Sequence, residues 1–200
     1  RGDDGFRLGP DGEQLIITAD VNITDQPHVD AMELVDEYLA NVGINLNVNV
    51  IDRSIMFERK NANQSEIHVW AAGGGGGLDP LLNAQQFFPD RLGARWAPAW
   101  GDWYFTRGDR GLEPPAEMQE MMELYRELQG VGAFEQQVEI MGEILQISAD
   151  YFPSVCLSTD VNEFGIVKND MRNVPESMFV SSTLPDPGAT FPEQYFFVQE

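Results

Sequence analysis

The chain has 200 residues, of which 42% are hydrophobic, so it contains enough apolar material for one folded domain with a core. Its formal charge of −21 argues against binding to nucleic acid, because phosphate contacts need lysine and arginine, and against docking on anionic lipid. The sequence has no run of about 18 apolar residues that could insert into a membrane. Its single cysteine, Cys156, lies in an apolar stretch and is predicted to be a small buried side chain.

The first third of the chain alternates between strand and helix patterns. Residues 44–50 place aliphatic side chains at every second position with asparagine between them, which is typical of a half-buried strand. Residues 27–42 repeat apolar side chains with helical spacing and stop at Gly43. The predicted elements, strand and helix in turn, cover residues 15–20, 27–42, 44–50, 52–59 and 66–72. This β-α-β-α-β order predicts an α/β fold with parallel strands and right-handed crossovers.

Five consecutive glycines, Gly73 to Gly77, follow the third predicted strand. Glycine lets the backbone turn sharply or approach a ligand closely, and ligands gather at the carboxyl ends of strands in open α/β sheets. A flexible connector is the alternative interpretation, but the position after the third strand favours a binding rim. The predicted ligand-binding residues of this rim are Trp70, Gly73, Gly74 and Asp79.

Residues 78–115 are predicted to be irregular and are rich in aromatic side chains. Aromatic faces bind sugar rings and apolar ligand surfaces, so Trp96, Trp100 and Trp103 are candidate ligand contacts. We expect about two aromatic residues of this segment to fill the core and one or two to face a cleft. The rest of the chain is predicted to form helices at 115–129 and 133–150, strands at 152–157 and 164–167, and an extended tail at 173–200.

No motif in the sequence supports a metal site, a cofactor or catalysis. His28 and His68 each lack cysteine or histidine partners at ligand spacing. The glycine run lacks the Lys-Ser/Thr pair that ends a phosphate-binding loop, and no Gly-x-Ser-x-Gly elbow is present. We therefore expect no metal, no cofactor and no enzyme activity.

Several motifs, taken in order, resemble a known family. They are an Asp/Gly-rich loop before residues 15–18, a helix at 31–39 leading into VGINLNV at 42–48, IHVW at 67–70 followed by glycines and Asp79-Pro80, a helix pair at 115–150 followed by FPSV at 152–155, and NDMRNVP at 169–175. Together they resemble the C-terminal half of the extracytoplasmic solute-binding proteins of ABC importers, in family 5, which binds peptides, nickel and some oligosaccharides.

The resemblance implies a two-lobed receptor that closes on its solute, with this chain supplying most of one lobe and the N-terminal lobe missing. Residues 1–168 would be the C-terminal ligand-binding lobe, and 169–200 an extended tail that returns toward the other lobe. The implied protein captures an oligopeptide or oligosaccharide outside the cytoplasm, in the periplasm or lipid-anchored at the cell surface. It would deliver the solute to the membrane permease of an ABC transporter.

One departure from the family pattern bears on the solute. Peptide-binding members often carry a tryptophan and an aspartate just after the strand that matches residues 66–72, and glycines stand there in this chain. This favours an oligosaccharide or another neutral ligand. Two other readings remain open at this point: an enzyme domain with a βαβ core, and an interaction module that uses the aromatic loop.

Overall fold

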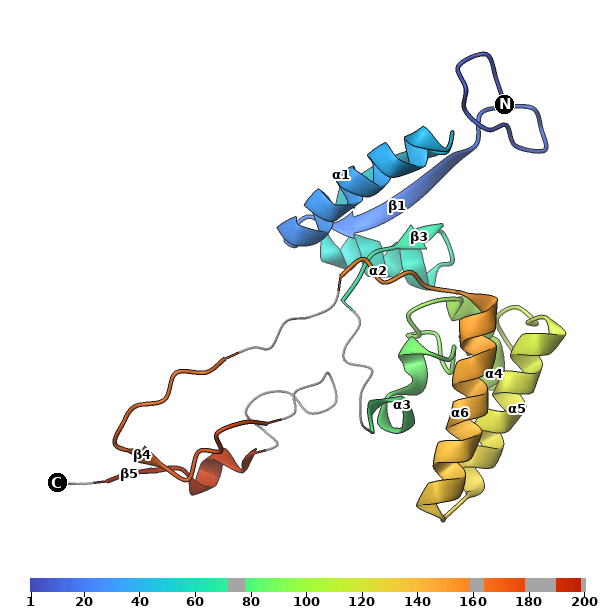
Figure 1. Cartoon of the computed structure of the whole chain (residues 1–200). Helices are drawn as coiled ribbons and strands as arrows, with labels where there is room; N and C mark the ends of the chain where they lie inside the picture. The colour runs from blue at the N-terminus through green and yellow to red at the C-terminus, as the bar shows by residue number, and fades with distance from the viewer. Residues whose placement is uncertain (72–77, 159–163, 179–189, 199–200) are drawn as a thin grey trace.

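The computed structural model describes residues 1–71, 78–158, 164–178 and 190–198 (Figure 1). Its first part is a parallel sheet of β1 (Ile16–Asn22), β2 (Asn45–Ile51) and β3 (Ile67–His68) in the order β2-β1-β3. Helices α1 (Gln26–Asn41) and α2 (Arg53–Asn61) connect the strands. The predicted β-α-β-α-β order is confirmed. β3 is shorter than predicted, although the backbone N–H of Val69 still donates to Asp20 O at 3.1 Å.

The two faces of this sheet have different chemistry. One face is apolar and packs against α1, with a core formed by Ala19, Val21, Val29, Met32, Leu46 and Val69. Because side chains alternate along a strand, Asp20, Asn49 and His68 lie on the other face. Side chains of α2 contact this polar face. The asparagines between the aliphatic residues of β2 therefore belong to a polar surface that faces α2.

The second part of the fold is helical. It contains α3 (Asp79–Leu82), the 3-10 turn η1 (Ala84–Gln86), α4 (Pro98–Thr106), α5 (Ala116–Gly130) and α6 (Phe134–Tyr151), and α5 and α6 lie side by side in Figure 1. The predicted helices at 115–129 and 133–150 are confirmed. The prediction that 78–115 is irregular is wrong at α4, where Pro98 occupies the first turn and Trp100, Trp103 and Tyr104 follow with helical spacing. A buried cluster holds these helices together: Ala84, Phe88, Tyr104, Met118, Met121, Met122, Leu128, Ile140, Met141 and Ile144.

After α6 the chain leaves the helices. The strands predicted at 152–157 and 164–167 are not formed, and Val155, Phe164 and Ile166 are 67%, 88% and 93% exposed. An apolar run becomes a strand only where a sheet edge accepts its backbone hydrogen bonds, and neither segment pairs with the sheet. Cys156 is also exposed, so the prediction that it is buried is wrong for the same reason.

The C-terminal region forms a small antiparallel pair of its own. β4 (Met171–Arg172) pairs with β5 (Phe196–Phe197), and the 3-10 turn η3 (Pro192–Gln194) precedes β5. Figure 1 shows this pair apart from helices α3 to α6. Within the described ranges, no helix has the length and apolar character needed to cross a bilayer.

Candidate functional site

Trp70 lies two residues beyond β3, at the carboxyl end of the parallel sheet. Its ring packs edge-on against Phe57 of α2, with 4.9 Å between ring centroids, and the guanidinium of Arg53 lies 4.8 Å from the Trp70 centroid. Arg53 is in the first turn of α2, which begins directly after β2, so it shares the sheet edge with Trp70. We call Arg53, Phe57, His68 and Trp70 the Trp70 edge. The predicted rim residue Trp70 is thus half-buried among a cation and two further rings.

His68 is half-buried within the Trp70 edge, and both of its ring nitrogens are buried. Its ring lies 5.3 Å from Phe57 and 6.3 Å from Trp70, and neither ring nitrogen has a hydrogen-bond partner among the described residues. Burial, followed by the charges of Lys60 and Arg95, lowers the pKa of His68 to about 4. The imidazole is therefore neutral at pH 7 and packs as an aromatic ring.

Two further cations lie beside His68. Lys60 is 3% exposed and donates from Nζ to the carbonyl oxygen of Ala94 at 2.7 Å. Burial, followed by the charge of Arg95, lowers the pKa of Lys60 to about 8. Burial, followed by the charge of Arg53, lowers the pKa of Arg95. The charge of Arg53 lowers the pKa of Arg95, and the charge of Arg95 lowers the pKa of Lys60. These three cations therefore lie close enough together to repel one another.

None of these three cations forms an ion pair with a residue that the structure describes. This is notable in a chain with 12 basic and 33 acidic residues, in which a positive side chain has many more potential partners than competitors. Arg53 is exposed at the carboxyl end of the sheet, whereas Lys60 is buried and Arg95 is half-buried, so only part of this positive charge reaches the surface.

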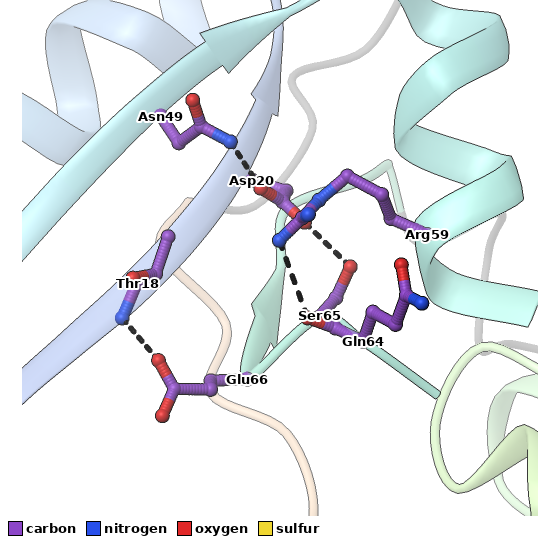
Figure 2. A network of polar contacts seen from close by, with 7 residues as sticks. All are labelled: Thr18, Asp20, Asn49, Arg59, Gln64, Ser65 and Glu66. Atoms are coloured by element: carbon purple, nitrogen blue, oxygen red, sulfur yellow. Dashed lines mark hydrogen bonds and ion pairs between the residues drawn. The ribbon is translucent and has the colours of Figure 1, made fainter. Parts of the chain in front are cut away.

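A buried carboxylate holds α2 in position under the sheet (Figure 2). Asp20 of β1 is fully buried, and its Oδ1 accepts a hydrogen bond from Asn49 Nδ2 of β2 at 2.6 Å. Its Oδ2 accepts from Arg59 Nε of α2 at 3.0 Å and from Ser65 Oγ at 2.5 Å. One side chain thereby joins two strands, a helix and the loop before β3.

Both oxygens of Asp20 are occupied, so this residue serves the fold rather than a ligand. Burial alone raises the pKa of Asp20, but the hydrogen bonds from Ser65, Asn49 and Arg59 outweigh it and the pKa is lowered. Nearby, Glu66 Oε2 accepts the backbone N–H of Thr18 at 2.7 Å, at the position just before β3 begins to pair with β1 (Figure 2). The Arg59–Asp20 contact ties α2 to the sheet, and α2 carries Arg53 and Phe57, which contact Trp70.

The predicted tryptophans of the aromatic segment lie in the helical part. Trp96 stacks on Tyr151 at 6.0 Å between centroids and meets Trp100 edge-on at 6.3 Å. Trp96, Trp100 and Trp103 are all half-buried against the helical core. Trp96 Nε1 is buried and has no hydrogen-bond partner among the described residues. Tyr151, at the end of α6, was not among the predicted site residues.

The remaining predicted site residues are placed as follows. Asp79 is the first residue of α3 and is 2% exposed. Gly73 and Gly74 lie outside the described residues. Residues 94–96 link the Trp70 edge to Trp96. Lys60 Nζ donates to the carbonyl oxygen of Ala94, the charge of Arg95 helps to lower the pKa of His68, and Trp96 is the next residue in the chain.

Sequence reasoning missed the polar members of this region. Arg53, Lys60 and Arg95 carry no motif, and Asp20 gains its partners only through strand register, which sets it opposite Asn49. The alternating asparagines of β2 were the one available signal of a polar sheet face. Among the residues that the structure describes, no group of three histidine, cysteine, aspartate or glutamate side chains is placed to hold a metal.

Comparison with known proteins identifies the fold of this chain. No family model and no curated protein matches the sequence. Among solved structures, the chain is similar to the oligopeptide-binding protein OppA, with 24% identity and a TM-score of 0.66 over 98% of this chain and 32% of OppA.

Two further solved structures are similar to the chain. NikA from Brucella suis, in complex with Fe(III)-EDTA, has 16% identity and a TM-score of 0.55 over 74% of this chain and 28% of NikA. The periplasmic binding protein MelB from Agrobacterium fabrum C58, in complex with stachyose, has 15% identity and a TM-score of 0.60 over 75% of this chain and 22% of MelB. This chain thus spans a third or less of each of these proteins, and it has the fold of part of a two-lobed periplasmic binding protein.

Proposed function

We propose that this chain is the solute-contacting part of a receptor that captures an oligosaccharide or oligopeptide for an ABC importer, and that the Trp70 edge contacts the solute. The observation that carries the proposal is the position of Trp70 beside the guanidinium of Arg53, at the carboxyl end of parallel strands. Ligands of open α/β sheets bind at such ends. The names of two similar structures, an oligopeptide-binding protein and a stachyose complex, agree with a solute of this size.

The chemistry of the edge favours an oligosaccharide over an oligopeptide. Aromatic side chains offer a flat surface to a sugar ring, and the exposed guanidinium of Arg53 can donate hydrogen bonds to hydroxyl oxygens. The ammonium group of a peptide would instead be repelled by Arg53, Lys60 and Arg95, which carry positive charge close together. Peptide receptors often carry an aspartate where this chain has glycines, and this difference also favours an oligosaccharide.

The wider organisation follows from the same proposal. Residues 1–168 would form the ligand-binding lobe, and 169–200 would return toward a second lobe. The receptor would work outside the cytoplasm with a membrane permease, and binding would close the two lobes about a hinge. The remainder of a two-lobed receptor would supply other solute contacts, so we expect the 200-residue chain by itself to bind solute more weakly than about 1 μM.

Calorimetry with stachyose and with trialanine tests the proposal, using a complete two-lobed receptor that contains this chain. We expect stachyose to bind, and Trp70→Ala to weaken its affinity at least about tenfold, which corresponds to about 1.4 kcal/mol. Tyr38→Ala removes an aromatic side chain on α1 that is 66% exposed and serves as the matched control. Unchanged affinity in Trp70→Ala would refute the role of this edge. Tighter binding of trialanine than of stachyose would reverse the preference for a sugar.

A further inference from the structure

Phe57 of α2 contacts every other member of the Trp70 edge. Its ring centroid lies 4.9 Å from that of Trp70 and 5.3 Å from that of His68, and both rings meet it edge-on, at 79° and 72°. Arg53 precedes Phe57 by four residues on α2 and places its guanidinium 5.7 Å from the Phe57 centroid. Residues four apart on a helix share a face, so α2 directs Phe57 and Arg53 together toward Trp70.

Side-chain contacts, rather than sheet pairing, hold Trp70 in place. The register of β3 with β1 extends to His68, and the backbone N–H of Val69 still donates to Asp20 O at 3.1 Å. Among the described residues, no backbone hydrogen bond reaches Trp70. The orientation of the Trp70 ring therefore depends on the side chains that pack against it.

The side chains around Trp70 restrain its ring to different degrees. The His68 ring lies nearly parallel to it, at 20° and 6.3 Å between centroids, which is a looser contact than the 4.9 Å of Phe57. Arg53 is long and exposed, so it keeps much of its rotamer freedom. Phe57 is half-buried and meets Trp70 in the edge-on arrangement that aromatic pairs prefer. Phe57 is therefore the side chain best placed to fix the plane of the Trp70 ring.

We propose that Phe57 is a positioning residue of the solute site, whose ring sets the orientation of Trp70 and thereby controls solute affinity. The inference rests on the proposed function, in which Trp70 contacts the solute. A binding side chain must be held within about 0.5 Å and 10–20° of its productive geometry by the residues behind it. A sugar ring that lies against an aromatic face is sensitive to the plane of that face, so loss of the Phe57 ring lowers affinity through Trp70.

A double-mutant cycle in the complete two-lobed receptor tests this role, with stachyose as the probe and calorimetry as the measurement. Phe57→Leu keeps an apolar side chain but removes the ring, and we expect it to weaken stachyose affinity about tenfold. In the Trp70→Ala background the same substitution should change affinity less than about twofold, because its effect acts through Trp70. An undiminished loss in that background would overturn the proposal, since Phe57 would then act by general packing.

The same cycle separates this inference from the proposed function. Unchanged affinity in Trp70→Ala refutes the solute site itself, and the positioning role falls with it. Weakened affinity in Trp70→Ala together with wild-type affinity in Phe57→Leu refutes only the positioning role.

Two further variants complete the test. Phe57→Tyr retains the ring and should bind stachyose within about threefold of wild type, so a loss equal to that of Phe57→Leu would overturn the need for a ring. Phe105→Leu is the matched control, because Phe105 lies on α4, is 70% exposed and is not part of the Trp70 edge. An equal loss in Phe105→Leu would show that the effect does not belong to Phe57. Circular dichroism checks the fold, and if Phe57→Leu does not fold, Phe57→Met takes its place with the same expected result.

Discussion

The guanidinium of Arg53 lies 4.8 Å from the centroid of the Trp70 ring, and this contact joins the start of α2 to the segment that follows β3. These two residues are 17 positions apart in the sequence. They meet because β2 and β3 are parallel, so the segments that follow both strands lie at the same edge of the sheet. The contact places a cation and an aromatic face at the edge where the proposed solute binds.

The Arg53–Trp70 contact should contribute measurably to stability. Arg53→Met keeps an apolar stem but removes the charge over the ring, so we expect the free energy of unfolding to fall by about 0.5–1 kcal/mol, as for exposed cation–π pairs. Urea unfolding followed by tryptophan fluorescence measures this. Arg107→Met, which removes an exposed arginine that has neither an ion pair nor an aromatic contact among the described residues, should change stability less. An equal effect of the two substitutions would show that the cation over Trp70 contributes nothing specific.

His68 should make the chain sensitive to acid. Its pKa is lowered from 6.5 to about 4, so between these pH values the unfolded state binds more protons than the folded state. Stability is therefore lost as the pH falls from about 6.5 toward 4, by up to about 3 kcal/mol from this residue at 1.36 kcal/mol per pKa unit. Urea unfolding of wild type and His68→Gln at several pH values should show a shallower loss in the variant. His28→Gln tests whether the change belongs to His68, and parallel pH profiles for wild type and His68→Gln would contradict the assignment.

The Asp20 network should be the most costly polar feature to disrupt. Asp20→Asn keeps the size of the side chain but removes the charge that Arg59 and Ser65 share, leaving buried donors poorly paired. We expect a loss of about 3 kcal/mol in the free energy of unfolding. Asp30→Asn, on the exposed face of α1, is the control and should cost less than about 0.5 kcal/mol. A similar small effect at both positions would mean that Asp20 does not anchor α2.

Two helical glycines should respond to alanine in opposite directions. A Cβ on Gly101 of α4 would lie 2.2 Å from the carbonyl oxygen of Arg91, whereas a Cβ on Gly142 of α6 would meet nothing within 4 Å. We expect Gly101→Ala to destabilise the chain by about 1–3 kcal/mol through overpacking. Gly142→Ala should instead stabilise it by about 0.5–1 kcal/mol, because alanine favours the helix. Thermal unfolding of both variants tests this, and a stabilising Gly101→Ala would contradict the close approach of α4 to the loop at Arg91.

Patterns within short segments predicted much of the fold. The apolar periodicity of residues 27–42, 115–129 and 133–150 identified three helices, because helical spacing is a local property that needs no knowledge of the partner. The alternation at 44–50 identified β2 in the same way. The strands expected at 152–157 and 164–167 did not form, because a strand requires a second strand to accept its hydrogen bonds, and sequence alone does not name that partner.

The candidate site was also only partly predictable from the sequence. The position of Trp70 after a third strand was readable from the order of the elements along the sequence. The contacts of Trp70 with Arg53 and Phe57 were not readable, because they form only when α2 packs beside the end of β3.

By itself the sequence determined the acidic charge, the alternation of strands and helices, and the strand end that bears Trp70, because each depends on composition or on near neighbours. Only the tertiary structure decided which cation lies over Trp70 and which carboxylate anchors α2. These depend on strand register and helix packing, in which residues far apart in the sequence become neighbours and burial shifts their pKa values.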